Sequence, residues 1–211
     1  DATAVRLPWD GFGEGSTVHL KTTTEMGFPG VPPQTSEQRQ TLVKITPEHY
    51  LIKHETKVGE QWMGGETTYP RKAAGATGDG RTEAKPEDLG TEAVAVEGKE
   101  YACKKQRYVV GGYTTTTWTH EKEGLLRNET KGAGSESSLV VTRLAFKTTV
   151  AGKEVEARET TMTSKAMGSE TKIKSWESRA VPGGTVRTEM VAEMAGMKTT
   201  TRTEVVAFEA K

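Results

Sequence analysis

The chain is poor in the residues that build thick hydrophobic cores. Of its 211 residues, 33% are apolar and 6% are aromatic, and the mean hydropathy is -0.63. A sheet with one buried face and one solvated face needs fewer apolar residues than a core enclosed on both sides, because every second strand position can be polar. A chain of this length commonly stays one domain when it is all-β. We therefore expect a single β domain over residues 1–211.

Cysteine, net charge and long apolar runs are also scarce, and each absence excludes a class of protein. Cys103 is the single cysteine, so the chain forms no intrachain disulfide and no multi-cysteine metal site. Lys and Arg together number 29, as do Asp and Glu. This balance supplies no basic patch for nucleic acid, which we exclude as a partner. No apolar run reaches the roughly 18 residues of a transmembrane helix.

Catalytic and metal-binding patterns are missing as well. His49 and His54 are five positions apart, which places them on opposite faces of a strand. His19 and His120 could approach one another across strands, but they lack a third ligand. No serine or cysteine lies in a motif that would activate it as a nucleophile. We predict that the protein is not an enzyme and holds no metal and no cofactor.

Threonine and glycine dominate what is present. Threonine occurs in runs at 22–24, 114–117, 148–149 and 199–201, and it favours strands because it is β-branched. The 23 glycines recur between alternating polar and apolar runs, as hairpin turns require. The pattern predicts strands at 17–24, 39–46, 49–58, 61–69, 91–97, 100–110, 113–120, 124–130, 138–149, 153–163, 170–177, 184–193 and 198–208.

Three segments interrupt this strand pattern. Residues 27–34 are rich in proline and residues 73–89 lack any periodicity, so we expect both to be loops. Residues 35–45 carry a weak capping-box pattern that leaves a helix as an alternative to a strand.

The second half of the chain repeats. Residues 96–101 match residues 150–155, Trp118 corresponds to Trp176, and 144–146 correspond to 206–208. The repeat units are therefore 90–150 and 151–211, each of about 55–60 residues. A weaker first half covers 1–72, because the four tryptophans recur at intervals of 53, 56 and 58 from Trp9 onward.

Alternation within the strands indicates one apolar face. Leu139, Val141 and Ala145 share one side of their strand, as do Val186, Thr188 and Met190 in theirs. Trp118 and Trp176 alternate with polar residues and so lie on faces that are otherwise polar. The fold class we predict is all-β, with a large curved antiparallel meander sheet that forms a half-barrel.

Methionines cluster late in the chain. Met surfaces adapt to varied apolar ligands, but flexible Met side chains also fill irregular cores. The sequence leaves both roles open for Met162, Met167, Met190, Met194 and Met197.

A family resemblance lies in the second half. Residues 90–103 carry the pattern G-x-E-x-V-x-V-x-G-K-x-Y-x-C, followed by a Thr-rich strand that ends in Trp176 and by Val181-Pro182-Gly183-Gly184. Over about residues 90–211 the chain resembles a group of uncharacterised secreted bacterial proteins. By shape these are similar to the lipoprotein-localisation (LolA/LolB-like) group, whose curved sheet holds acyl chains. The resemblance implies a lipid or lipoprotein as partner and a secreted or periplasmic location, and Asp1 in place of Met fits a removed leader or cloning.

The sequence leads to two functional hypotheses. The first is a non-catalytic secreted or cell-envelope protein whose curved sheet binds an apolar ligand or a protein partner. We expect its binding face to use Trp62, Met63, Trp118 and Trp176 as aromatic and apolar anchors. The alternative is a structural or self-assembly module without a small-molecule ligand, in which sheet edges or the Thr-rich face associate with other copies. The ligand, the partner and the oligomeric state do not follow from the sequence.

Overall fold

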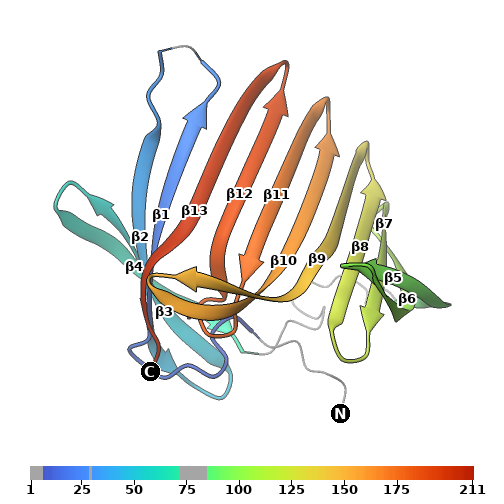
Figure 1. The fold of residues 1–211 in the computed structure, drawn as a ribbon, viewed down its shortest axis with the longest axis horizontal. Coiled ribbons are helices and arrows are strands. Elements are labelled where there is room, and N and C mark those ends of the chain that lie inside the picture. The colour runs from blue at the N-terminus through green and yellow to red at the C-terminus, as the bar shows by residue number, and fades with distance from the viewer. Residues whose placement is uncertain (1–6, 29, 72–84) are drawn as a thin grey trace.

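Thirteen antiparallel strands form one curved, unclosed sheet in the computed structural model, which describes residues 7–28, 30–71 and 85–211 (Figure 1). These residues contain no helix. The strands are β1 (Thr17–Met26), β2 (Gln34–Ile45), β3 (His49–Val58), β4 (Gln61–Pro70), β5 (Glu87–Val96), β6 (Lys99–Val110), β7 (Tyr113–His120), β8 (Gly124–Gly132), β9 (Ser135–Val150), β10 (Lys153–Ala166), β11 (Ser169–Glu177), β12 (Thr185–Met194) and β13 (Met197–Glu209).

The strand order is a meander with one long-range pairing. It runs β4-β3-β2-β1-β13-β12-β11-β10-β9-β8-β7-β6-β5. The first and last strands pair with each other as the fourth and fifth strands of the sheet, with Thr22 opposite Thr203. The edges are therefore β4 and β5, two strands that follow one another in the sequence.

The predicted fold class and all thirteen predicted strands are confirmed. The helix considered for 35–45 is wrong, because this segment belongs to β2. That strand starts at Gln34, earlier than predicted, since its first residues are polar and carry no apolar alternation. The loop predicted at 73–89 is wrong for residues 87–89, which begin β5; residues 73–84 lie outside the described part of the chain. A register shift between Asp88 and Thr91 hides the start of β5 from the alternation pattern.

Short turns with a glycine in second position connect many of the strands. In six of them both central residues have positive φ, the conformation that matches the right-handed twist of a hairpin. Gly152, at φ +79°, adopts this conformation without the steric cost that a side chain would bring. Each turn needs only two residues, so the strands stay in continuous antiparallel register. The six pairs are Glu97-Gly98, Gly111-Gly112, Ala133-Gly134, Ala151-Gly152, Met167-Gly168 and Ala195-Gly196.

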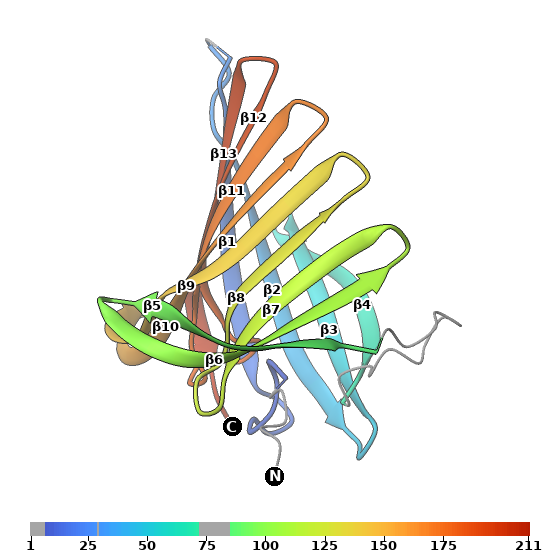
Figure 2. The same ribbon diagram turned by 90° about the vertical axis from the view of Figure 1, so that its right-hand side faces the viewer.

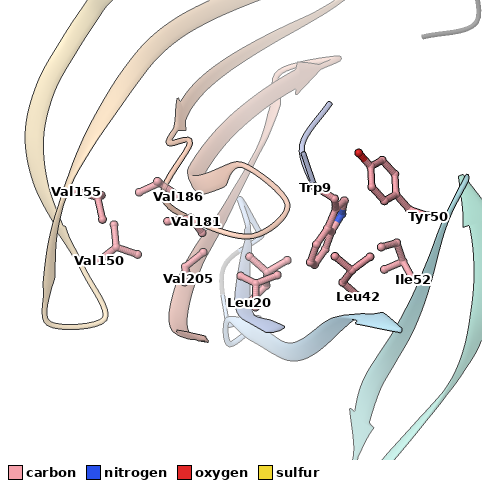
Figure 3. Packing of buried hydrophobic residues seen from close by; sticks show 11 residues of the cluster. Trp9, Leu20, Leu42, Tyr50, Ile52, Val150, Val155, Val181, Val186 and Val205 are labelled. Atoms are coloured by element: carbon pink, nitrogen blue, oxygen red, sulfur yellow. The ribbon is translucent and has the colours of Figure 1, made fainter. Parts of the chain in front are cut away.

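The main hydrophobic core lies inside the curve of the sheet (Figure 3). It joins strands that are far apart in the sheet order, with Ile52 on β3 and Val155 on β10 in one cluster. Side chains from such distant strands can meet only on the concave side, so this cluster identifies the inner face. Trp9, from the segment before β1, packs into the cluster beside Leu42 and Tyr50.

A second, smaller cluster lies among β5–β9, and it includes Leu126 and Val141. Val94, Cys103 and Trp118 are buried there, on the side that also carries Lys105 and Arg127. Trp9, unlike the other three tryptophans, lies outside the strands, in the turn that precedes β1.

Candidate functional site

The two faces of the sheet differ sharply in charge. Residues that are paired across neighbouring strands lie on the same face, so the strand register gives rows that cross the sheet. Between β6 and β2, three neighbouring rows contain no charged residue; beyond β6 the first row reaches Asp88 on β5. The first is Gln106, Thr117, Asn128, Leu139, Met162, Ile173, Met190, Thr201, Thr24 and Gln34. The second is Tyr108, Thr115, Thr130, Ser137, Ser164, Thr171, Ala192, Thr199 and Met26, and the third is Val141, Thr160, Ser175, Thr188, Thr203, Thr22 and Ser36.

These rows, which we call the uncharged face, continue the concave side of the sheet. Thr22 lies two positions from Leu20, and Thr203 lies two positions from Val205, so both alternate with residues of the main core. Apart from Val141 and the exposed Gln34 and Ser36 on β2, the residues in the three rows are half-buried. Val141 is buried. The uncharged face is therefore the inner surface above the core.

An apolar stripe crosses the middle of the uncharged face. Leu139, Met162, Ile173 and Met190 are paired in sequence on β9, β10, β11 and β12. Three steps of about 4.8 Å between neighbouring strands give the stripe a width of roughly 14 Å. Two of the late methionines thus lie on the inner face, half-buried and outside both buried clusters.

Threonine hydroxyls on this face hydrogen-bond to one another across strands. The Oγ1 atoms of Thr22 and Thr203 are 2.9 Å apart, and those of Thr24 and Thr201 are 3.3 Å apart. Each such pair satisfies part of its own hydrogen-bonding capacity, which leaves methyl groups as a larger share of the accessible surface. The threonine rows therefore flank the apolar stripe with a weakly polar surface.

The opposite face, which we call the charged face, carries ion pairs along the strands. Lys174 Nζ lies 3.0 Å from a carboxylate oxygen of the buried Glu159, and the Glu189 carboxylate contacts Arg187 and Arg202. Burial alone raises the pKa of Glu159. The hydrogen bonds from Thr142 and Lys174 and the charge of Lys174 outweigh that effect and hold the pKa below its ordinary value.

Three of the four sequence-predicted site residues lie on the charged face. Trp62 lies beneath Arg39, whose guanidinium is 4.8 Å from the ring centre, and its strand position is opposite Lys57. Trp118 is 3% exposed and lies between Lys105 and Arg127. A ligand can therefore reach Trp118 only if its neighbours move.

Trp176 and Met63, the other two, lie on different faces. Trp176 is half-buried and contacts Lys174 and Arg187 at its strand position, but it also packs against the main hydrophobic core. Met63 is opposite Thr56 on the edge strand β4 and is 59% exposed. Thr56 is in turn opposite Gln38, which faces Leu20, so Met63 belongs to the inner side. The structure does not bring the four residues together on one surface.

Trp118 and Trp176 have similar surroundings. Each is paired with an arginine on the next strand, and that arginine contacts a glutamate two positions further on. A shift in strand register comes directly after each tryptophan. These shared features sit at corresponding positions of the two predicted repeat units.

The described residues show no cluster suited to metal binding or nucleophilic catalysis. Residues 7–28, 30–71 and 85–211 contain no group of three or more His, Cys, Asp or Glu placed to hold a metal ion. His19 packs against Trp62, while His120 packs against Tyr101, and six strands separate their two strands in the sheet order. Cys103 is fully buried, and burial raises the pKa of its thiol.

A groove of about 700 Å³ lies at one end of the sheet, between neighbouring hairpin turns. Its walls carry charges of both signs, from Lys131, Glu136, Lys165, Glu170 and Glu193. Charged walls favour water or polar groups over an apolar molecule. The uncharged face is thus the better candidate for an apolar ligand.

Comparison with known proteins adds little beyond the shape of the sheet. Neither protein-family models nor curated proteins match the sequence. Among solved structures, the chain is similar to a LolA superfamily protein from Nitrosomonas europaea, with 8% identity and a TM-score of 0.34 over 100% of this chain and 90% of that one. A likeness of this degree says nothing about what the chain binds. Within the described ranges, no helix is long and apolar enough to cross a membrane.

Proposed function

We propose that this protein is a non-catalytic binding protein that holds a neutral apolar molecule, such as an acyl chain, on its uncharged face. The observation that carries the proposal is the segregation of charge between the two faces. Along the middle of β11 and β12 every charged side chain lies on the outer face, at Glu170, Lys172, Lys174, Arg187, Glu189 and Glu193. Leu139, Met162, Ile173 and Met190 lie together on the inner one. Burying a charge without a partner is costly, so a surface free of charge suits an apolar ligand.

The ligand fits this surface for two further reasons. The four apolar residues are half-buried, so their exposed parts gain free energy when an apolar molecule covers them. Two of the four are methionines, whose flexible side chains adapt to ligands of different shape. A lipid or the acyl chain of a lipoprotein has this chemistry. The resemblance of residues 90–211 to secreted bacterial proteins supports a location outside the cytoplasm.

A pair of neighbouring substitutions tests the proposal. Met190 and Val191 are adjacent on β12, both half-buried, but they face opposite sides of the sheet. Met190→Lys places a charge in the apolar stripe, whereas Val191→Lys adds the same charge to the face that already carries charges. The neutral fluorophore N-phenyl-1-naphthylamine serves as the probe, and circular dichroism checks the fold of each variant.

The two variants should differ by about tenfold or more in affinity for the probe, because one buried apolar contact of this size is worth on the order of 1.5 kcal/mol. Equal weakening by Met190→Lys and Val191→Lys would contradict the proposal. A Trp62→Phe variant tests the site predicted from the sequence. Trp62 lies on the charged face and outside both hydrophobic clusters, so its loss should weaken binding only if the ligand lies on that face. That site stays a prediction until this variant is measured.

One observation favours the alternative, a self-assembly module. The edge strand β4 pairs with β3 without a register shift, and Glu66 is its single charged residue. The other edge, β5, is interrupted at Asp88 and carries three acidic residues, features that discourage edge-to-edge pairing. Sedimentation velocity over a wide concentration range tests this function. Growth of a dimer with concentration supports it, and a monomer at all concentrations refutes it.

A further inference from the structure

Six connections lie along one rim of the sheet (Figure 2). The turn between β3 and β4 carries Glu60, and the other five follow one another without a break. These five are the loop between β1 and β2 and the turns β6–β7, β8–β9, β10–β11 and β12–β13. None of their described tip residues is charged. We call these residues the apolar rim: Phe28, Val31, Val109, Val110, Tyr113, Ala133, Met167, Met194, Ala195 and Met197.

The side chains of the apolar rim point into solvent. Eight of the thirteen exposed large hydrophobic residues in the described chain belong to it. Met167 is 98% exposed, and Phe28 is 50% exposed. Met167 also has a φ of +48°, a conformation that favours glycine or asparagine over a long apolar side chain. Neither packing nor turn geometry accounts for methionine at this tip.

The opposite end of the sheet provides a comparison within the same molecule. Its turns carry charged residues at or beside their tips, such as Glu48 between β2 and β3 and Lys122 between β7 and β8. The turn between β9 and β10 runs directly into Lys153 and Glu154. Exposed apolar tips are therefore not a general property of the turns in this chain. They gather along one rim.

We propose that the apolar rim docks on the surface of a lipid bilayer, with the tips of the hairpins immersed in the interface. The tips are separate points along an arc. The small side chain of Ala133 lies between tips that carry larger apolar side chains. A fluid interface can surround each tip independently, whereas a folded protein partner would need a matching pocket for every one. Burial of apolar side chains in the interface supplies the binding free energy.

The charge of the rim indicates which lipid surface suits it. Lys131, Lys165 and Lys198 lie just behind the tips, but Glu136, Glu170 and Glu193 lie beside them on the same face. The rim thus has no net positive potential that would select anionic lipids. We infer that it binds zwitterionic bilayers through apolar contact, and that its binding changes little with salt. This inference does not depend on a ligand on the uncharged face.

Vesicle flotation with phosphatidylcholine liposomes tests the proposal on the full chain. The wild-type protein is expected to float with the vesicles at low and at high salt. Met167→Asn should lower the partition coefficient by about tenfold if the methionine is fully immersed, because that corresponds to the burial of one such side chain. Asparagine is favoured at positive φ, so the turn keeps its conformation.

The matched control is Val206→Ser. Val206 is 44% exposed, as the rim residues are, but it lies near the end of β13 that is away from the rim. This variant should float like the wild type. Failure of the wild type to bind vesicles, loss of binding in high salt, or equal loss in the Met167 and Val206 variants would each overturn the proposal. Vesicle binding that persists when probe binding is lost in Met190→Lys would separate it from the proposed ligand site.

Discussion

Glu159→Gln should lower the free energy of unfolding by about 2 kcal/mol at pH 7. The Glu159 side chain is 8% exposed and accepts a 2.7 Å hydrogen bond from Thr142 Oγ1 and a 3.0 Å contact from Lys174 Nζ. A hydrogen bond to a charged group contributes roughly 1.5–3 kcal/mol, and one between neutral groups about 1 kcal/mol. Gln keeps the neutral bond to Thr142 but loses the charge at both contacts. Because Lys174 is 44% exposed, water replaces part of its lost interaction.

The same carboxylate makes stability depend on pH in a defined direction. The pKa of Glu159 is lower in the folded state than the ordinary value of 4.5. Its contribution is therefore fully present above about pH 5 and is lost as the pH falls through the folded-state pKa. Urea unfolding of the wild type and of Glu159→Gln should give curves that converge as the pH falls below the ordinary pKa value of 4.5.

Glu154→Gln is the control for this prediction. Glu154 forms a 2.8 Å ion pair with Lys147, but the two side chains are 64% and 78% exposed. Exposed pairs contribute little, so the loss should stay within about 0.5 kcal/mol. Equal losses for Glu154→Gln and Glu159→Gln at pH 7, or a Glu159→Gln difference that is unchanged at acid pH, would refute the reasoning.

Three further outcomes follow from the core and the turns. Leu42→Ala, at a fully buried position, should lower the unfolding free energy by about 3 kcal/mol in urea titration. Cys103, also fully buried and with a raised thiol pKa, should react with a thiol reagent only as fast as the sheet unfolds. Ala151→Asn should stabilise the protein by about 0.5 kcal/mol, because Ala151 has a φ of +48° before Gly152 and asparagine-glycine is favoured in such hairpin turns.

The strands could be predicted from the sequence because the turn residues and the alternation of polar and apolar residues indicate the same boundaries. Gly98 and Gly152 mark turns whose conformation demands glycine, and the alternating runs between turns have the period of a strand. The pattern fails at Gln34 and Glu87, where strands begin with polar residues or with a register shift. Hydrogen bonds to the neighbouring strands extend both segments, and these partners cannot be identified from local alternation.

The candidate site was only partly predictable. The sequence predicted that Leu139 and Val141 share one side of their strand and that Met190 lies on the apolar side of its own. The strand pairing places all three residues in the uncharged rows. Ala145 is exposed instead, because register shifts around residues 141–146 change the alternation of β9. The signal for the inner face was the absence of charge at alternate positions of β10 and β12, rather than the tryptophans.

The tryptophans drew attention because aromatic residues often anchor ligands. In this chain Trp62, Trp118 and Trp176 each stack against an arginine or lysine on the charged face. Which face a strand presents to the inside depends on how the whole sheet curves. That curvature depends on distant contacts such as those of Trp9 with Leu42, which the repeat does not reveal.

Native mass spectrometry of the protein from its natural source, followed by organic extraction, tests the central claim most directly. The account predicts a neutral apolar molecule in near-stoichiometric amount with the wild type and with Val191→Lys, and its loss from Met190→Lys. Wild-type protein that carries no ligand, or a ligand retained equally by both variants, would contradict binding on the uncharged face.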